Sequence, residues 1–168
     1  CYVASGGASV LSRPDRTAKG LTVRNQEAGF MRGYFGIGAE GISKAMNVGA
    51  LMRTTHAFGS SVCFTAVASY APKARGKADT SKGAGNLPVY EFADAESLLL
   101  PRGCALVGIE LTDDAIELPS FRHPRAAAYV LGPERGSLSP GLTALCDHVV
   151  KIPTRFCVNI GLAGAIVM

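Results

Sequence analysis

Residues 132–136 form a predicted turn with glycine at both ends and opposite charges, Glu134 and Arg135, at its tip. Because glycine can adopt a positive φ and lets the backbone come close to a ligand, this turn could form one edge of a binding site. The flanking residues suit such an edge, since 129–131 have the pattern of a buried strand and Ser139–Pro140 is typical of a helix start. An ordinary connection from strand to helix would show the same local pattern.

An arginine occurs on a second segment, residues 44–58, which has helical spacing and which Gly59 would end. Gly49, Arg53 and His56 fall on one face of this predicted helix. Since Gly49 has no side chain, it leaves room beside the guanidinium of Arg53. The alternative role for Arg53 is a salt bridge on the helix surface.

Cysteine and histidine give no sign of a metal site or of a disulfide framework. The five cysteines are an odd number and are widely spaced without a C-x-x-C pair, and the three histidines form no H-x-x-x-H cluster. We therefore predict reduced thiols and no bound metal.

The composition indicates a globular protein with a modest preference for anionic partners. The 168 residues are 48% hydrophobic and 18% charged, with a formal net charge of +4. No apolar run approaches the length of a membrane span, and the opening residues lack the basic start and apolar core of a secretory signal. We expect a cytoplasmic protein that does not enter a membrane.

Residues 69–88 are rich in glycine, lysine and proline and carry a single acidic residue, Asp79. Their basic residues are Lys73, Arg75, Lys77 and Lys82. A loop of this length inside a compact domain is commonly functional. A solvated surface loop is the alternative.

Strand and helix patterns alternate along the chain. Strands are predicted at 34–37, 61–67, 89–92, 104–109, 129–131 and 149–152, and helices at 44–58, 94–100, 140–146 and from Asn159 onward, with an irregular link at 118–125. This alternation predicts an α/β fold with a mainly parallel sheet flanked by helices. The sheet would occupy one domain, residues 31–168. Residues 1–30 show little periodicity and are expected to be a flexible or extended segment.

Gly36–Gly41 match G-x-G-x-x-G, a turn that holds the pyrophosphate of a dinucleotide at a helix N-terminus. That fingerprint needs a good preceding strand and an acidic residue roughly 20 positions later. The preceding strand is short, and no acidic residue lies between Glu40 and Asp79. A flexible glycine turn explains the match better.

Three motifs occur in an order and spacing typical of one family. Asn47–Arg53, followed by Ala57–Gly59, are similar to N-x-G-x-x-x-R with an A-x-x-F-G extension. Residues 132–136 are similar to G-x-E-x-x-G, although here the second glycine follows Glu134 by two positions. Residues 152–153 then lead into 157–159, Cys-Val-Asn, where the family usually has Ser-Leu-Asn. On these motifs the chain resembles the SpoU/TrmH group of SPOUT RNA methyltransferases.

The resemblance runs from about Met31 to Met168 and carries several expectations about structure and activity. It implies a C-terminal deep trefoil knot, an exception to the rule that chains are unknotted. It also implies a homodimer, S-adenosylmethionine bound in the knot, and methyl transfer to tRNA or rRNA, commonly at a ribose 2′-hydroxyl.

A cofactor in such a knot would be held largely by backbone groups at the ends of three strands, where glycine and small apolar residues are wanted. The candidate cofactor-binding residues are Val107, Gly108, Leu131, Gly132, Ile152, Pro153, Cys157, Val158 and Asn159. For the three pairs at the strand ends, 107–108, 131–132 and 152–153, packing in the core is the alternative role, most of all for Val107 and Leu131.

The resemblance assigns a central catalytic role to Arg53. Since arginine retains its proton in proteins, we expect Arg53 to orient a phosphate and to stabilise the developing alkoxide. Asn47 would help to hold the site, and Glu134 would pair with Arg53 or with the substrate. The candidate RNA-binding residues are Lys73, Arg75, Lys77, Lys82 and Arg155.

Cys157 is the main departure from the family pattern, because a thiol forms weaker hydrogen bonds than a serine hydroxyl. This difference leaves open a knotted RNA-binding protein with impaired catalysis. A separate alternative is a nucleotide-binding α/β enzyme that uses Gly36–Gly41.

Overall fold

The computed structural model of the chain describes residues 33–69 and 83–168. The predictions made for residues 1–30 and for the four basic residues Lys73, Arg75, Lys77 and Lys82 lie outside the described residues.

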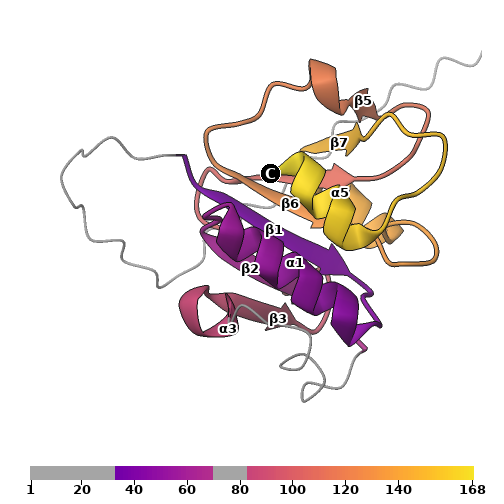
Figure 1. Cartoon of the computed structure of the whole chain (residues 1–168). Helices are drawn as coiled ribbons and strands as arrows, with labels where there is room; N and C mark the ends of the chain where they lie inside the picture. Colours follow the sequence, from indigo (N-terminus) through magenta and orange to yellow (C-terminus); the bar gives the residue numbers. More distant parts are fainter. Residues whose placement is uncertain (1–32, 70–82) are drawn as a thin grey trace, which may run out of the picture.

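Within residues 33–69 and 83–168, seven strands form one sheet in the order β3-β2-β1-β6-β4-β7-β5 (Figure 1). They span Phe35–Glu40 (β1), Val62–Ala66 (β2), Val89–Phe92 (β3), Ala105–Ile109 (β4), Ile116–Glu117 (β5), Ala127–Leu131 (β6) and His148–Lys151 (β7). Every pair of neighbouring strands is parallel, which confirms the mainly parallel sheet that the sequence predicted.

The strand order reverses beside β1. From β1 the chain moves outward through β2 to β3 and then crosses to the other side of β1, where β6 and β4 lie. In open α/β sheets, ligands bind outside the carboxyl ends of the strands at such a reversal. The topology therefore points to the carboxyl ends of β1 and β6, between which the order reverses.

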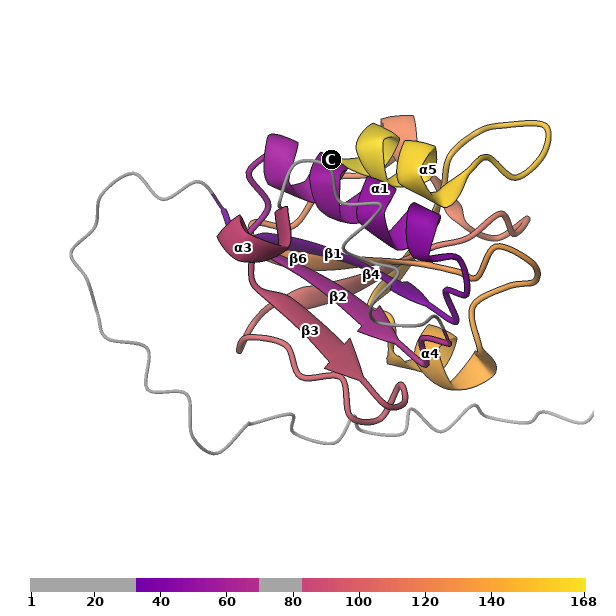
Figure 2. The same ribbon diagram turned by 60° about the horizontal axis from the view of Figure 1, so that its bottom comes forward.

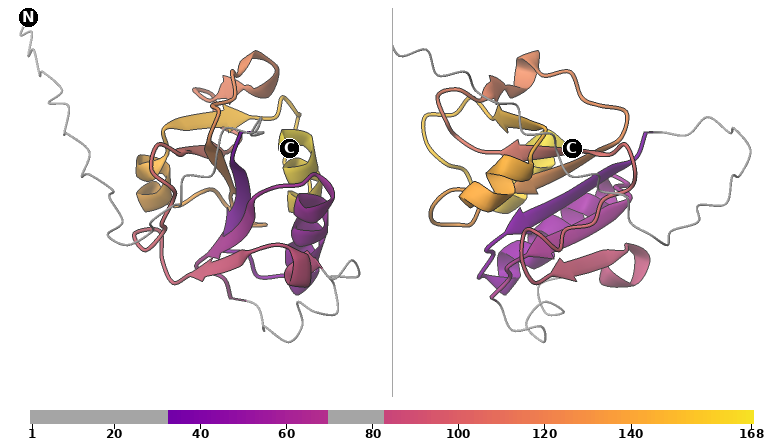
Figure 3. Two further views of the ribbon diagram at one scale, coloured as in Figure 1. Left: turned by 90° about the vertical axis from the view of Figure 1, so that its left-hand side faces the viewer. Right: turned by 180° about the vertical axis from the view of Figure 1, so that it is seen from behind.

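Helices cover both faces of the sheet (Figure 2). α1 (Ala45–Ala57) and α5 (Ile160–Val167) lie side by side on one face, and α4 (Pro140–Leu145) lies on the other (Figure 3). A four-residue helix, α3 (Gly83–Asn86), follows the undescribed segment, and a 3₁₀ turn spans Leu118–Ser120. The three-layer arrangement confirms the predicted α/β class.

Alternate residues of β6 pack into the hydrophobic clusters on the two opposite faces of the sheet. Tyr129 and Leu131 belong to the cluster shared with α1 and α5, whereas Ala128 and Val130 belong to the cluster on the α4 face. All four are almost fully buried. A strand that is buried on both faces reads as a continuous apolar run, which explains why the sequence revealed this strand clearly.

Two glycines are required by close packing. A Cβ atom on Gly38 in β1 would lie 2.4 Å from the ring of Phe64, and a Cβ atom on Gly164 in α5 would lie 2.6 Å from Leu51 Cδ1. Gly164 thereby lets α5 approach α1 closely, and the position of α1 relative to α5 matters for the site described below.

The G-x-G-x-x-G match is part of a strand, so its interpretation as a flexible turn was wrong. Gly36 and Gly38 are buried within β1 and pair in register with Val62 and Phe64 of β2. Only Gly41, which follows the strand, has a positive φ, at +61°. The glycines therefore serve packing inside the sheet, and no helix N-terminus follows them directly.

Residues 94–100 were predicted to be helical, and this prediction was wrong. The Ser97 N–H donates to Asp94 Oδ1 at 2.7 Å, and the Ser97 hydroxyl donates to the Asp94 carbonyl at 2.9 Å. These bonds close a single turn, and Pro101 disfavours helical backbone at the residue before it, so the turn does not continue as a helix. The segment forms bends and turns instead.

Candidate functional site

A cavity of about 350 Å³ lies at the carboxyl ends of β4, β6 and β7, where α1 and α5 begin. Its wall combines aliphatic side chains with a few polar groups. The lining residues are Lys44, Asn47, Ile109, Glu110, Leu111, Leu131, Gly132, Pro133, Glu134, Gly136, Ile152, Thr154, Cys157, Val158, Asn159, Ile160 and Ala163. The cavity thus adjoins the reversal of strand order between β1 and β6, on the β6 side.

A chain of hydrogen bonds joins the three sequence motifs at this cavity. The Asn159 side-chain amide donates to Asn47 Oδ1 at 3.2 Å, and the Asn47 amide donates to Glu134 Oε1 at 3.1 Å. These residues are 112 and 87 positions apart in the sequence. The fold thus brings together Asn47, Glu134 and Asn159, which the sequence analysis had placed in one site.

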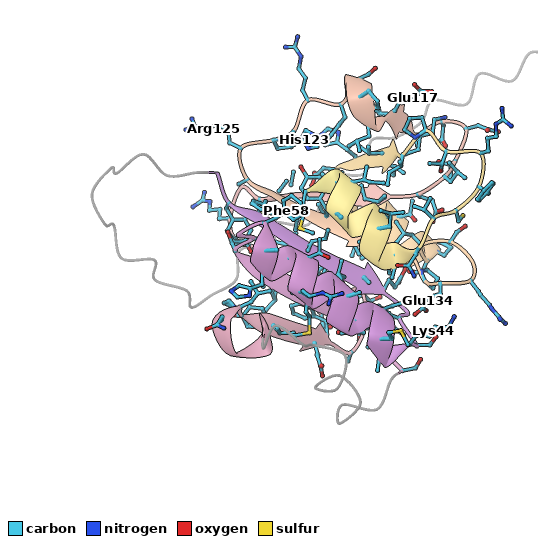
Figure 4. All side chains as sticks on the ribbon, in the orientation of Figure 1. Lys44, Phe58, Glu117, His123, Arg125 and Glu134 are labelled. Atoms are coloured by element: carbon cyan, nitrogen blue, oxygen red, sulfur yellow. The ribbon has the colours of Figure 1, made fainter. Side chains whose placement is uncertain are left out.

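Glu134 acts as the cap of α1. The N-cap residue Lys44 offers no side-chain cap of its own. Glu134 Oε1 accepts the Lys44 N–H at 3.1 Å, and Oε2 accepts the Ser43 N–H at 3.2 Å and the Ser43 hydroxyl at 3.1 Å. Figure 4 shows Glu134 next to Lys44 at the lower end of α1. A carboxylate is well placed there, because helix N-termini have unpaired N–H groups and a partial positive charge.

The same contacts set the ionisation of Glu134. Burial alone would raise the pKa of this carboxyl group, but the hydrogen bonds from Ser43, Lys44 and Asn47 outweigh burial and hold the pKa below its usual value of 4.5. Glu134 is therefore a carboxylate at neutral pH. The hydrogen bonds it accepts come from residues 43–47, whereas the sequence analysis expected it to pair with Arg53 or with the substrate.

Two further carboxylates hold the other end of the turn. Glu110, which follows β4, accepts the Leu138 N–H at 2.7 Å. Glu40, at the end of β1, accepts the Ser139 N–H at 2.7 Å and the Ser139 hydroxyl at 2.5 Å. The segment from Gly132 to Ser139 is thus fixed by two carboxylates from other elements and by its own Glu134, which binds the start of α1.

Gly132 and Gly136 are the two glycines that this turn needs. A Cβ atom on Gly132 would lie 3.3 Å from both Glu110 Oε2 and the Leu138 nitrogen. Gly136 has a φ of +105°, a conformation that other residues rarely adopt. Gly136 thus supplies the positive φ that the sequence predicted for this turn, and Gly132 allows close packing against Glu110 and Leu138.

Most of the candidate cofactor-binding residues line the cavity, namely Leu131, Gly132, Ile152, Cys157, Val158 and Asn159. Val107 and Gly108 do not line it. Val107 is fully buried in the core, and Gly108 faces Leu138 and Cys146 on the α4 side. The wall begins only at the last residue of β4, so the sequence analysis placed this edge of the site about two residues too early. Pro153 is exposed and also does not line the cavity.

Arg53 lies on α1 but is not among the residues that line the cavity. Its side chain is exposed. Arg53 lies six positions after Asn47, which corresponds to about 9 Å along a helix axis. Arg155 is also exposed, in the link between β7 and α5.

Several residues of the cavity wall were not predicted from the sequence. Among them are the charged residues Lys44 and Glu110 and the exposed Leu111. Glu110 and Leu111 follow a predicted buried strand directly, and residues at the carboxyl ends of parallel strands meet at one edge of the sheet. That rule could have identified them. Lys44 could have been found as the residue before the first turn of the helix that carries Asn47.

No metal site or membrane helix appears in the described part of the chain. Within residues 33–69 and 83–168, no group of three or more His, Cys, Asp or Glu side chains could hold a metal ion. In the same ranges, none of the helices has the length and apolar character needed to cross a membrane.

Solved structures of RNA methyltransferases share this fold at low sequence identity. The AdoMet-bound rRNA methyltransferase from Sinorhizobium meliloti is 15% identical and has a TM-score of 0.71 over 82% of this chain and 55% of that chain. The SpoU methyltransferase AviRb from Streptomyces viridochromogenes, in complex with the cofactor AdoMet, is 20% identical and has a TM-score of 0.67 over 82% of this chain and 58% of that one.

A third structure, an RNA 2′-O ribose methyltransferase, is 19% identical and has a TM-score of 0.68 over 92% of this chain and 58% of that chain. The chain thus spans little more than half the length of these three proteins. No curated protein matches the chain in sequence.

Residues 35–168 match the model of the SpoU rRNA Methylase family. The match begins at the first residue of β1 and includes all the residues that form the cavity. We conclude that the chain belongs to the SpoU rRNA Methylase family, as its three sequence motifs predicted.

Proposed function

We propose that this chain transfers a methyl group from S-adenosylmethionine to RNA, at a ribose 2′-hydroxyl of tRNA or rRNA. The observation that carries the proposal is the hydrogen-bonded chain Asn159–Asn47–Glu134, which joins all three family motifs at the edge of one cavity. The RNA 2′-O ribose methyltransferase with the same fold supports the choice of a ribose acceptor.

The lining of the cavity fits S-adenosylmethionine, the cofactor of this family. Its volume of about 350 Å³ lies in the range of small-molecule sites. Leu131, Ile152 and Val158 offer apolar surface for an aromatic base, and Gly132 contributes backbone to the cavity wall. When bound, the cofactor supplies a methyl group on a positively charged sulfur.

Glu110 and Glu134 would act on different parts of this cofactor site. Each Glu110 oxygen accepts one backbone N–H, from Leu111 or Leu138, and a carboxylate oxygen can accept a second hydrogen bond from a ribose hydroxyl. Glu134 is already bonded on both oxygens to the start of α1. We therefore assign ribose binding to Glu110 and positioning of Asn47 to Glu134.

Arg53 would act on the RNA. An arginine keeps its proton, so it can neutralise a phosphate or stabilise a developing alkoxide but is a poor base. Its exposed position on α1, outside the cavity wall, supports contact with RNA phosphate beside the cavity. Arg155 and the basic residues Lys73, Arg75, Lys77 and Lys82 are proposed as further contacts to the RNA backbone.

Three properties implied by the family are proposed with this function: a C-terminal trefoil knot, a homodimer and a cytoplasmic location. The homodimer has support in the surface of α5. This helix has no charged residue, and Leu162 and Ile166 are 53% and 44% exposed. A second copy of the chain would remove these apolar side chains from water.

Cys157 favours a second candidate function, RNA binding with impaired catalysis. It lines the cavity at the position where the family usually has serine, and a thiol is the weaker hydrogen-bonding group. The nucleotide-binding alternative has lost its basis, because the Gly36–Gly41 segment is a strand followed by a turn.

The test combines cofactor binding with methyl transfer. Calorimetry should detect binding of S-adenosylmethionine, and mass mapping of nucleosides should find methylated ribose in RNA incubated with the chain and cofactor. Arg53→Ala should reduce methyl transfer by about 10- to 150-fold, the range for loss of one hydrogen bond to a charged group. Arg102→Ala, at an exposed arginine before β4, is the matched control.

Each result has a distinct meaning. Absence of cofactor binding would overturn the proposed function. Cofactor and RNA binding without methyl transfer would favour the impaired protein. Methyl transfer that survives Arg53→Ala unchanged would remove only the role of Arg53.

A further inference from the structure

We propose that Phe156 stacks against an unstacked base of the RNA and that Arg155 neutralises a phosphate beside it. The link between β7 and α5 would then present one nucleotide of the substrate to the cavity. This inference rests on the proposed function, because it concerns how that substrate is held.

Phe156 has an unusual environment for a phenylalanine. Its side chain is 75% exposed, although the residues around it in sequence belong to a binding site. Thr154 and Cys157 both line the cavity, while Phe156 itself does not. The ring therefore stands next to the cavity without filling it, and nothing in residues 33–69 and 83–168 removes it from water.

The backbone that carries Phe156 makes a local turn before it and is held to α1 after it. Before it, the Thr154 N–H donates to the Ile152 carbonyl at 2.7 Å. After it, Asn159 Oδ1 accepts the Gly161 N–H at 2.9 Å, and the Asn159 amide reaches Asn47 at 3.2 Å. An aromatic ring on an anchored link can hold a ligand in a defined place, which a ring on a long free loop cannot do.

The charge around Phe156 favours a nucleic acid. The adjacent Arg155 is exposed, and residues 148–168 contain Lys151 and Arg155 but no acidic residue. Single-stranded nucleic acids bind to surfaces that combine cations for the phosphates with aromatic rings for the bases. A methyl acceptor must also come within about 3–3.5 Å of the methyl donor in the correct orientation, so one nucleotide has to be held apart from its neighbours.

The absence of tryptophan from the chain allows a direct optical test. Phe156→Trp introduces a single tryptophan, whose fluorescence a stacked base would quench. Phe58→Trp is the matched control, since Phe58 is 52% exposed and lies at the opposite end of α1 from Lys44 and Glu134 (Figure 4). The probes are a single-stranded RNA of mixed sequence and a ribose-phosphate oligomer of equal length that lacks bases.

We expect the RNA to quench the tryptophan at position 156, and we expect neither the oligomer without bases nor the control position to show this quenching. Equal quenching by the two oligomers, or at the two positions, would overturn the stacking. This measurement needs no methyl transfer, so it also holds if the chain binds RNA without catalysis.

A kinetic comparison separates stacking from simple apolar contact. Phe156→Leu should raise the KM for RNA by about 5- to 150-fold, the range for loss of one base-stacking ring. Phe156→Tyr should restore the KM, and the affinity for S-adenosylmethionine should stay unchanged in both variants. An unchanged KM in Phe156→Leu, together with methyl transfer by the unaltered chain, would overturn the inference while leaving the proposed function intact.

A second copy of the chain is the competing occupant of this surface. If Phe156 were part of a dimer interface, Phe156→Leu would shift the sedimentation coefficient toward that of the monomer. The fluorescence of Phe156→Trp would then depend on protein concentration and would not change on addition of RNA. That outcome would also overturn the inference.

Discussion

Glu134 supplies the side-chain cap that the local sequence lacks at the N-terminus of α1, the helix end that borders the cavity. Ser, Thr, Asp and Asn are the usual N-cap residues, yet α1 begins after Lys44, whose side chain cannot accept a hydrogen bond. A carboxylate 90 positions away supplies the acceptor. Stability of the helix start and integrity of the site therefore depend on one side chain.

The acid stability of the protein should reveal this dependence. Because hydrogen bonds lower the pKa of Glu134 in the folded state, its contribution is complete above the ordinary value of 4.5 and is lost as the pH falls through the lower, folded value. Glu134→Gln should lower Tm at pH 7 and should weaken the fall of Tm on going from pH 5 to pH 3. Thermal melts at several pH values measure both effects.

Glu96→Gln is the control for that comparison, because Glu96 is an exposed carboxylate outside the site. It should leave Tm at pH 7 almost unchanged. If the Tm curves of Glu134→Gln and the unaltered chain run parallel between pH 3 and pH 7, the capping role is wrong.

The cysteines should differ in reactivity according to their surroundings. Cys157 is exposed and lines the cavity, whereas Cys63 is buried. Burial, and secondarily the charge of Asp147, raises the pKa of Cys104 to about 11, so this group stays a thiol at pH 8. We expect iodoacetamide to modify Cys157 faster than Cys63 or Cys104, with peptide mass spectrometry as the measurement.

S-Adenosylmethionine at saturating concentration should slow the alkylation of Cys157, since the cofactor would occupy the same cavity. Adenosine triphosphate at equal concentration is the control for a general nucleotide effect. Alkylation of Cys157 at the same rate with and without S-adenosylmethionine would mean that the cofactor binds elsewhere or does not bind.

The helices and strands that the sequence predicted correctly are those with a clear pattern of apolar residues. The helix at 44–58 and the strand at 129–131 have clear apolar patterns and were confirmed as α1 and β6. β5 was missed because it has only two residues, both exposed. The segment 94–100 was misassigned because its apolar spacing resembles a helix while Asp94 and Ser97 bond to the local backbone.

The site was predictable where a motif supplied its residues and unpredictable where distant contacts supplied them. Asn47, Glu134 and Asn159 belong to motifs and were identified. The bond between Glu110 and Leu138, and that between Glu40 and Ser139, leave no mark on the local sequence, because they depend on which strands are neighbours. Only the topology of the sheet brings these pairs together.

Ser139 illustrates an element that depends on both kinds of contact. Its hydroxyl accepts the Leu142 N–H at 3.1 Å to cap α4, and it donates to Glu40. Ser139→Ala should therefore lower the free energy of unfolding by about 1 kcal/mol or more, the usual value for loss of a cap. Urea denaturation gives this value, and Ser137→Ala, at an exposed residue of the same turn, is the control.

The outcome of Ser139→Ala also bears on the cavity. Since Ser139 anchors the turn that begins at Gly132, its loss should weaken the binding of S-adenosylmethionine as well as stability. Equal stability of Ser139→Ala and Ser137→Ala would contradict the proposed double role of the hydroxyl.

One face of the sheet carries both α1, which borders the cavity, and α5, which has no charged residue. α1 and α5 lie together on this face (Figure 2), and the cavity opens where both begin. The outer side of α5 exposes Leu162 and Ile166 to water. Dimerisation through this surface would place a second copy close to the helices that build the cavity.

The proposed dimer should be disrupted by charge on α5. Leu162→Glu places a carboxylate where the interface would be desolvated, and burial of an unpaired charge is strongly unfavourable. We expect the unaltered chain to sediment as a dimer and Leu162→Glu as a monomer with the same circular dichroism spectrum.

Leu99→Glu, at a 65% exposed leucine outside α5, is the control and should remain dimeric. A monomeric unaltered chain at high concentration, or a dimeric Leu162→Glu variant, would show that α5 does not form the interface. The apolar character of its outer side would then need another explanation.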